Sequence, residues 1–312
     1  MSAGGGTKAI IAALLANAGI AVAKFIGYLI TGSSSMLAEA VHSVADTSNQ
    51  GLLLLGGKRA QRQATQEHPF GYGRDRYFYS FVVALLLFSL GSVFALYEGF
   101  HKLESEESLT SPLVAIVILV VAIVLETLSF RTAIRESRPL KGDGTWWQFI
   151  RQSKTPELPV VLLEDAGALF GLVLALGGVG LSMLTGNIVW DAIGTLCIGV
   201  LLGVIAIILI VETKSLLIGE GSGPVEVRVI HQALVGGGVD RVIHLRTQYI
   251  GPDELLIAAK IAVPATMPTA ELARVIDEAE GRVRGAVHAA RIIYLEPDLD
   301  RTPRPAVELP SS

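Results

Sequence analysis

Three residues in the segment MLAEAVHSVADTSNQ (residues 36–50) have the types and spacing to do chemistry together. Glu39, His42 and Asp46 are spaced i, i+3 and i+7, so a helix places them on one face, because each residue turns the chain by about 100°. The surrounding sequence is apolar, and such groups are costly there unless they face a bundle interior or a water-filled path. The stripe predicts a site that handles a metal ion or protons. The alternative is a polar stripe that only packs helices together.

His42 and Asp46 form the pair best suited to a metal. Side chains four residues apart on one helix can reach a common point, and an imidazole with carboxylates suits zinc while tolerating cobalt, cadmium, iron or manganese. Metal ligands must be deprotonated, so metal binding releases protons. Glu39, Asn49 and Asn17 are candidates for the surrounding polar shell or for a proton path.

A second pair of acids, Glu164 and Asp165, lies within PVVLLEDAGALFGLVLALGG. Their apolar surroundings argue against solvated surface, and the alternative is a helix end that dips into the membrane interface. Neighbouring residues on a helix point about 100° apart, so both cannot project straight at one point. We predict that Asp165 is a metal ligand, and that Glu164 either bends back as a further ligand or serves as a proton acceptor.

The composition predicts an α-helical membrane protein. Hydrophobic residues make up 51% of the 312 residues, charged residues 17%, and the mean hydropathy is +0.54. A net charge of −4 argues against a nucleic-acid partner, and the single Cys197 excludes an intramolecular disulfide framework and a Cys-rich zinc site. Six apolar stretches approach or exceed the roughly 20 residues that cross a bilayer, at residues 9–30, 36–57, 78–100, 112–134, 158–184 and 188–210.

The loop charges predict an orientation in the membrane. The loops after the second and fourth stretches are rich in Lys and Arg, whereas the loop after the third is acidic. The basic loops and both termini are therefore expected to be cytoplasmic, or on the equivalent side of an organelle. With no cleavable signal peptide visible, we expect a multi-pass protein of the bacterial inner (cell) membrane. Lys24 is expected to snorkel, and Glu126 to meet headgroups or a cation near the end of its span.

The polar sequence after residue 212 predicts a separate cytoplasmic domain. Its order of helix, strand, strand, helix and strand is that of a small α+β domain of the ferredoxin-like αββαβ type. We divide the chain into a six-helix transmembrane domain (1–212), a C-terminal dimerisation domain (213–298) and a disordered tail (299–312).

Four motifs occur in a fixed order: HSVAD in the second stretch, HPFGYGR after it, an acid in the fifth, and ETKSLLIGE after the sixth. Together they resemble the cation diffusion facilitator family, most closely its zinc transporter nine-like branch. The resemblance implies a homodimeric antiporter without a prosthetic group. It also implies one ligand pair on the second span, matched by His42 and Asp46, and one on the fifth, matched only at Asp165 because Val161 stands four residues earlier. Glu164 is the first candidate for the missing ligand, and Glu39, Asn49 or a water molecule are the alternatives.

The resemblance also bears on the C-terminal domain. Family members that bind metal there are similar in having His on all three strands. Here the first strand carries His244, the second Lys260 and the third Tyr294. We therefore expect no full regulatory metal cluster in this domain.

These observations predict a proton-coupled divalent-cation antiporter that exports zinc from the cytoplasm by alternating access. An iron or manganese exporter with the same site is the first alternative. A membrane-embedded metalloenzyme, with Glu39 as general base, is the second, but the sequence shows no nucleophile or phosphate-binding loop to support it. The expected partners are the metal ion, protons, the lipid bilayer and a second copy of the chain.

Overall fold

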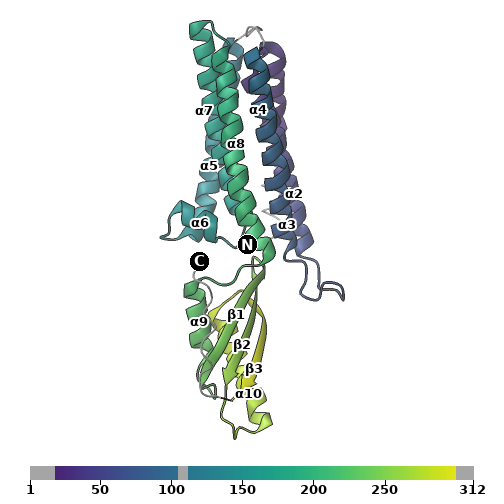
Figure 1. The fold of residues 1–312 in the computed structure, drawn as a ribbon, viewed down its shortest axis with the longest axis vertical. Helices are drawn as coiled ribbons and strands as arrows, with labels where there is room; N and C mark the ends of the chain where they lie inside the picture. Colours follow the sequence, from purple (N-terminus) through teal and green to yellow (C-terminus); the bar gives the residue numbers. More distant parts are fainter. Residues whose placement is uncertain (1–17, 105–111, 300–312) are drawn as a thin grey trace. The chain divides into compact units, whose positions relative to one another are not determined.

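The computed structural model describes residues 18–104 and 112–299 and divides the chain into two compact units, the first ending at Ile218 and the second beginning at Gly219 (Figure 1). The division lies six residues beyond the boundary placed from the sequence. The reason is that the last helix of the first unit continues through the polar residues Glu212–Lys214 to Ile218, and Gly219, with a φ of 120°, follows it. Residues 300–312 of the expected tail lie outside the described residues.

The first unit is helical, and its long helices run side by side (Figure 1). Its elements are the helix Ala18–Thr31, α2 (Ser34–Ala60), α3 (Asp75–Val82), the π-helix η1 (Val83–Phe88), α4 (Ser89–Glu104), α5 (Pro112–Lys141), α6 (Trp146–Gln152), α7 (Glu157–Thr185) and α8 (Val189–Ile218). Helix α2 packs against α3, α4, α7 and α8, while α5 packs against α7.

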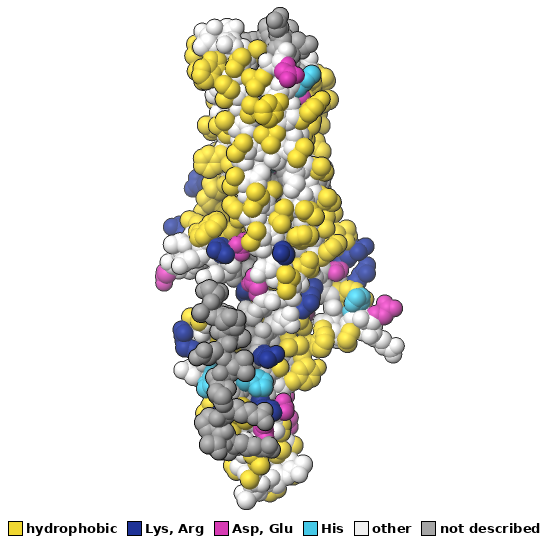
Figure 2. All heavy atoms as spheres, viewed as in Figure 1, with side chains coloured by type: hydrophobic (Ala, Val, Ile, Leu, Met, Phe, Trp, Pro, Cys, Tyr) yellow, Lys and Arg dark blue, Asp and Glu magenta, His cyan; other side chains and the backbone are white. Residues whose placement is uncertain are grey.

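Four segments of the described chain are long and apolar enough to cross a membrane: Asp75–Glu104, Leu113–Lys141, Glu157–Thr185 and Val189–Ile218. Part of the first expected stretch lies before the described residues, which begin within it at Ala18. The second, α2, has the length but carries many polar residues. The outer surface of this unit is apolar (Figure 2), while its interior holds charged side chains, as expected for helices surrounded by lipid.

The start of α2 is fixed to α8 by one buried carboxylate. Ser33 caps α2 by accepting a hydrogen bond from the backbone N–H of Met36. Asp191 of α8 accepts hydrogen bonds from the Ser33 hydroxyl at 3.0 Å, and from the backbone N–H and hydroxyl of Ser34 at 3.0 and 3.1 Å. A negative charge at a helix N-terminus is also favoured by the helix dipole. Asp191 therefore sets where α2 begins.

The second unit contains a small three-stranded sheet. Its elements are α9 (Pro224–Leu234), β1 (Arg241–Gly251), β2 (Glu254–Ala262), α10 (Thr269–Ala286) and β3 (Ala290–Asp298), in the element order predicted from the sequence. The sheet order is β1-β2-β3, with β1 antiparallel and β3 parallel to β2. Apolar residues of the sheet and of both helices form its core, among them Ile230, Leu255, Ile257, Val275 and Val283.

Lys260 lies on the middle strand, near the position where metal-binding relatives are expected to have a histidine ligand. In the register, His244 pairs with Lys260, and Lys260 pairs with Glu296. The ammonium contacts Glu296 at 2.9 Å and Asp298 at 3.2 Å. Hydrogen bonds to these two carboxylates raise the pKa of Lys260 above its usual value, so the lysine stays charged and repels a cation.

Replacing Asp191 by Ala should destabilise the protein by about 3 kcal/mol, because the Ser33 and Ser34 donors would lose a buried charged acceptor. Thermal unfolding in detergent measures the change. The exposed Asp143 provides the matched control, since Asp143→Ala removes the same carboxylate from the surface. Equal melting temperatures for the two variants would contradict the anchoring role of Asp191.

Calorimetry on a folded fragment of residues 220–312 should detect no tight zinc binding, because Lys260 takes the central position and one imidazole is too few for a tight site. Circular dichroism of the same sample checks that the fragment is folded. Binding of two zinc ions per chain at micromolar affinity or better would overturn this expectation.

Candidate metal centre

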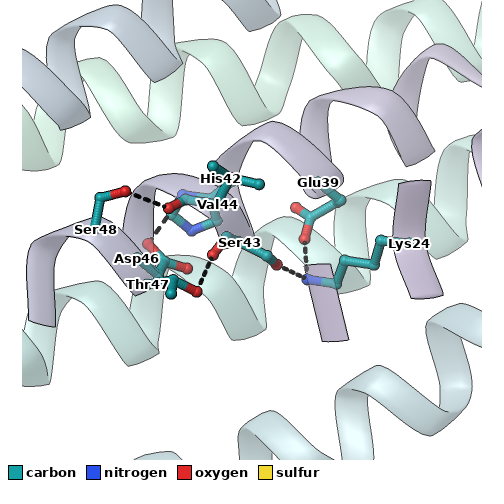
Figure 3. A network of polar contacts seen from close by, with 8 residues as sticks. All are labelled: Lys24, Glu39, His42, Ser43, Val44, Asp46, Thr47 and Ser48. Carbon is teal, nitrogen blue, oxygen red and sulfur yellow. Dashed lines mark hydrogen bonds and ion pairs between the residues drawn. The ribbon is translucent and has the colours of Figure 1, made fainter. Parts of the chain in front are cut away.

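Helix α2 carries its predicted polar stripe into the protein interior. Glu39, His42, Asp46 and Asn49 are exposed by only 0%, 2%, 5% and 1%. The Nδ1 atom of His42 lies 3.4 Å from the Oδ1 atom of Asp46, one helical turn further along (Figure 3). The i, i+4 spacing read from the sequence thus corresponds to a contact between an imidazole and a carboxylate inside the bundle.

Helix α7 contributes the second pair, and both members are buried. Glu164 and Asp165 are exposed by 2% and 5%, so they do not lie at a solvated helix end. Asp165 accepts a hydrogen bond from the Ser129 hydroxyl of α5 at 3.1 Å. Glu164 instead has the Asn49 side chain of α2 as its close polar neighbour. The two adjacent acids therefore point toward different helices, Asp165 toward α5 and Glu164 toward α2.

Glu126 of α5 belongs to the same acidic cluster, whereas it was expected near the end of its span, beside headgroups or a cation. It lies midway along α5, is only 6% exposed, and interacts electrostatically with Asp46, Glu164 and Asp165. The error came from ending the helix at residue 134, whereas α5 continues to Lys141. An acid inside a long apolar run, the signal used for Asp165, was also present at Glu126.

Lys24 does not snorkel to the membrane interface as expected. Its side chain is fully buried, and its ammonium donates to Glu39 Oε2 at 3.1 Å and to the Ser43 hydroxyl at 2.7 Å (Figure 3). The lysine ammonium is therefore paired with an acid inside the protein and does not reach the lipid headgroups. The remaining candidate from the sequence, Asn17, lies outside the described residues.

The chemistry of these side chains fits a cation. Both carboxylate oxygens of Glu164 and the amide oxygen of Asn49 are buried without a well-formed hydrogen bond from the described residues. Buried acceptors that lack donors are unfavourable unless something positive satisfies them. Val161, at the position of the missing family ligand, packs into the apolar core instead.

The donors are nevertheless spread over several helices. Among the described residues, no three His, Cys, Asp or Glu side chains are close enough together to enclose one ion. The pair of α2 and the acids of α7 lie on helices that pack against each other. Binding one ion to both pairs would therefore require the side chains, or the helices, to move together.

Comparison with known proteins gives the family. The family model described as the cation efflux transmembrane domain matches residues 10–218. Relatives include the proteins named proton-coupled zinc antiporter SLC30A9, mitochondrial, from Mus musculus and Xenopus laevis, which are 34% and 36% identical over 76% of this chain. Metal tolerance protein C4 of Arabidopsis thaliana is 30% identical over 81% of the chain. The matches span 42%, 43% and 56% of these relatives' own lengths, so the chain corresponds to only part of each.

The relatives also correct the expected location. The expectation of a bacterial cell membrane is wrong, because the SLC30A9 relatives are named as mitochondrial proteins and point to a mitochondrial membrane. The charge rule still predicts that the basic loops and both termini share one side, which in an organelle is the side equivalent to the cytoplasm.

The match over residues 10–218 and the identity to transporters rather than enzymes agree with the motifs and with the buried acids of α2 and α7. The chain belongs to the cation efflux family of metal transporters, which is the cation diffusion facilitator family that its motifs resemble.

Proposed function

We propose that this chain exchanges divalent zinc for protons across the membrane by alternating access, exporting the metal from the compartment that faces its basic loops. The observation that carries the proposal is a set of ligand-type side chains, one imidazole and several carboxylates, buried in an apolar helical unit. The names of the SLC30A9 relatives, proton-coupled zinc antiporters, support the same activity.

The proposed ligands are His42 and Asp46 from α2 with Asp165 and Glu164 from α7. Zinc favours four nitrogen or oxygen ligands in a tetrahedron, and these residues supply that number. Glu164 takes the place that Val161 leaves open, since it faces α2 and its oxygens lack donors. In this proposal Asn49 and Glu39 belong to the surrounding polar shell or to a proton path.

Proton exchange follows from the ligand types. A carboxylate or imidazole must be deprotonated to bind a metal, so metal entry expels protons. When the metal leaves, buried carboxylates that would otherwise stand uncompensated take protons up again. A site that alternates between these two states couples the flow of metal to an opposite flow of protons.

The architecture proposed for this activity has six spans. The helix Ala18–Thr31, with the residues before it, and α2 would add two spans to the four that are long and apolar enough. Both termini would then lie on the side of the basic loops. We further propose that the second unit is a ferredoxin-like dimerisation domain and that the transporter is a homodimer bound in the lipid bilayer.

An iron or manganese exporter is the alternative that a specific observation favours. The cluster contains one imidazole but four acids, Asp46, Glu126, Glu164 and Asp165. Oxygen ligands suit harder ions than nitrogen ligands do. Uptake by proteoliposomes of zinc, iron and manganese, with and without a pH gradient, separates these alternatives.

Asp46→Ala should abolish zinc flux while leaving the protein folded, because it removes a ligand that the apolar surroundings cannot replace. Ser48→Ala, on the exposed side of the same helix, is the matched control and should transport normally. Flux is measured in proteoliposomes loaded with a zinc indicator. Transport at the unaltered rate by Asp46→Ala would refute the site.

His42→Asp should retain transport but shift its preference toward manganese, since an oxygen ligand replaces nitrogen. The ratio of manganese to zinc uptake, measured on the same vesicles, reports the shift. If the ratio stays as in the unaltered protein, His42 is not a ligand.

Glu164→Gln should weaken zinc binding by about tenfold or more, because a neutral amide is a poor zinc ligand. Equilibrium binding across a range of pH measures this, with Asp165→Asn as the comparison that loses binding in any case. If Glu164 carries only protons, the affinity of Glu164→Gln stays near that of the unaltered protein while the pH dependence of transport flattens.

A further inference from the structure

The helix Ala18–Thr31 places a lysine inside the protein next to the metal centre (Figure 3). Lys24 is completely buried, and so is the Glu39 carboxylate that it contacts at 3.1 Å. Its second contact, 2.7 Å to the Ser43 hydroxyl, involves the residue that follows His42 in α2. A fully buried lysine is rare and needs a specific partner, which Glu39 supplies.

Glu39 is also confined on its other side. A Cβ atom placed on Gly171 of α7 would come within 2.5 Å of the Glu39 Oε1 atom, so the carboxylate occupies the space that the missing side chain leaves. One oxygen thus faces Lys24 and the other lies against the α7 backbone. Glu39 shares a helix face with His42 and Asp46, but its Oε2 atom is held by Lys24, while its Oε1 atom lies against α7 without a hydrogen bond from the described residues.

The lysine charge acts on the metal centre itself. Lys24 interacts electrostatically with Glu39, His42, Asp46 and Glu126. Charges act strongly on one another in a protein interior, where screening by solvent is weak. A divalent cation at His42 and Asp46 is therefore repelled by Lys24 and attracted by Glu39, and the two effects oppose each other as long as the pair is intact.

We propose that Lys24 is a positioning residue for the metal centre: it holds Glu39 out of the metal's coordination and offsets its charge, so that the site binds the ion weakly enough to release it. The inference rests on the proposed metal transport and adds to it a determinant of affinity. Zinc release would slow if Glu39 were freed, because one more carboxylate would then act on the ion.

The test uses three variants of the full chain in proteoliposomes at alkaline pH, which favours the ionised form of a carboxyl group that has lost its lysine partner. Lys24→Met should lower the KM for zinc by about tenfold and lower kcat as well, because Glu39 is uncompensated. Glu39→Gln should raise the KM, because it leaves the lysine charge uncompensated. The double variant Lys24→Met with Glu39→Gln should return both constants to near those of the unaltered protein.

Two other roles for the pair give different patterns. If Glu39 is a metal ligand, the double variant stays as weak as Glu39→Gln, because the ligand is still missing. If the pair is only structural, both single variants lose folded protein, and the KM of the remaining fraction does not move in opposite directions. Either pattern overturns the inference.

The control is Lys102→Met, which removes another buried lysine whose ammonium bonds the carbonyl oxygen of Gly32 at 3.1 Å. It should leave the KM for zinc unchanged. Failure of the unaltered protein to exchange zinc for protons would refute the proposed function instead. Normal exchange by that protein, with an unchanged KM in Lys24→Met, would refute only the role of Lys24.

Discussion

The burial of ionisable groups in an apolar bundle is the constraint on which the rest of this structure depends. Removing a charge from water costs several kcal/mol in a protein interior even after relaxation, so each buried acid must find a donor, a cation or a proton. Three buried acids of the first unit differ in how far this demand is met. Asp191 receives hydrogen bonds from two serines, Glu39 receives a lysine, and Glu164 receives neither from the described residues.

The first unit therefore contains an acid that is fixed by hydrogen bonds and acids whose charge a bound cation or proton can balance. The hydrogen bonds of Asp191 join α8 to the start of α2, which keeps that end of α2 in place. Further along α2, Asp46 and Asn49 face the acids of α7, and no lysine or arginine of the described residues is paired with those acids. A cation or protons can balance them instead. Helix α2 is thus fixed to α8 at its N-terminus, and its candidate metal ligands follow further along the helix.

The local pattern of the sequence predicted the α2 side of the site well. Spacing by i, i+3 and i+7 is a property of one helix, and Glu39, His42 and Asp46 are all buried along it. It also predicted that Glu164 and Asp165 diverge, since adjacent residues on a helix cannot point the same way. It could not say that Asp165 would meet Ser129 of α5 while Glu164 faced α2, because packing between helices is not encoded in the periodicity of either one.

The errors of the sequence analysis have a related cause. Lys24 was expected to snorkel and Glu126 to lie near the end of its span, and each instead interacts with groups on other helices. The helix α5 continues past Arg131, Arg135 and Pro139 to Lys141, so a stretch read as a basic loop is part of the helix. Charged residues near a span end do not mark where a helix stops, since water beyond the lipid can solvate them on a continuing helix.

A transporter faces a requirement that a storage site does not, because it must bind its ion and also let it go. Each added acid strengthens binding and slows release, so a cluster with Asp46, Glu126, Glu164 and Asp165 is already strongly attractive to a cation. Glu39 lies on the same face of α2 and would add to that attraction if it were free. Its pairing with Lys24 lets the chain keep a polar group at this position without another uncompensated charge at the metal centre. The buried lysine is thereby explained by the acidity of its surroundings.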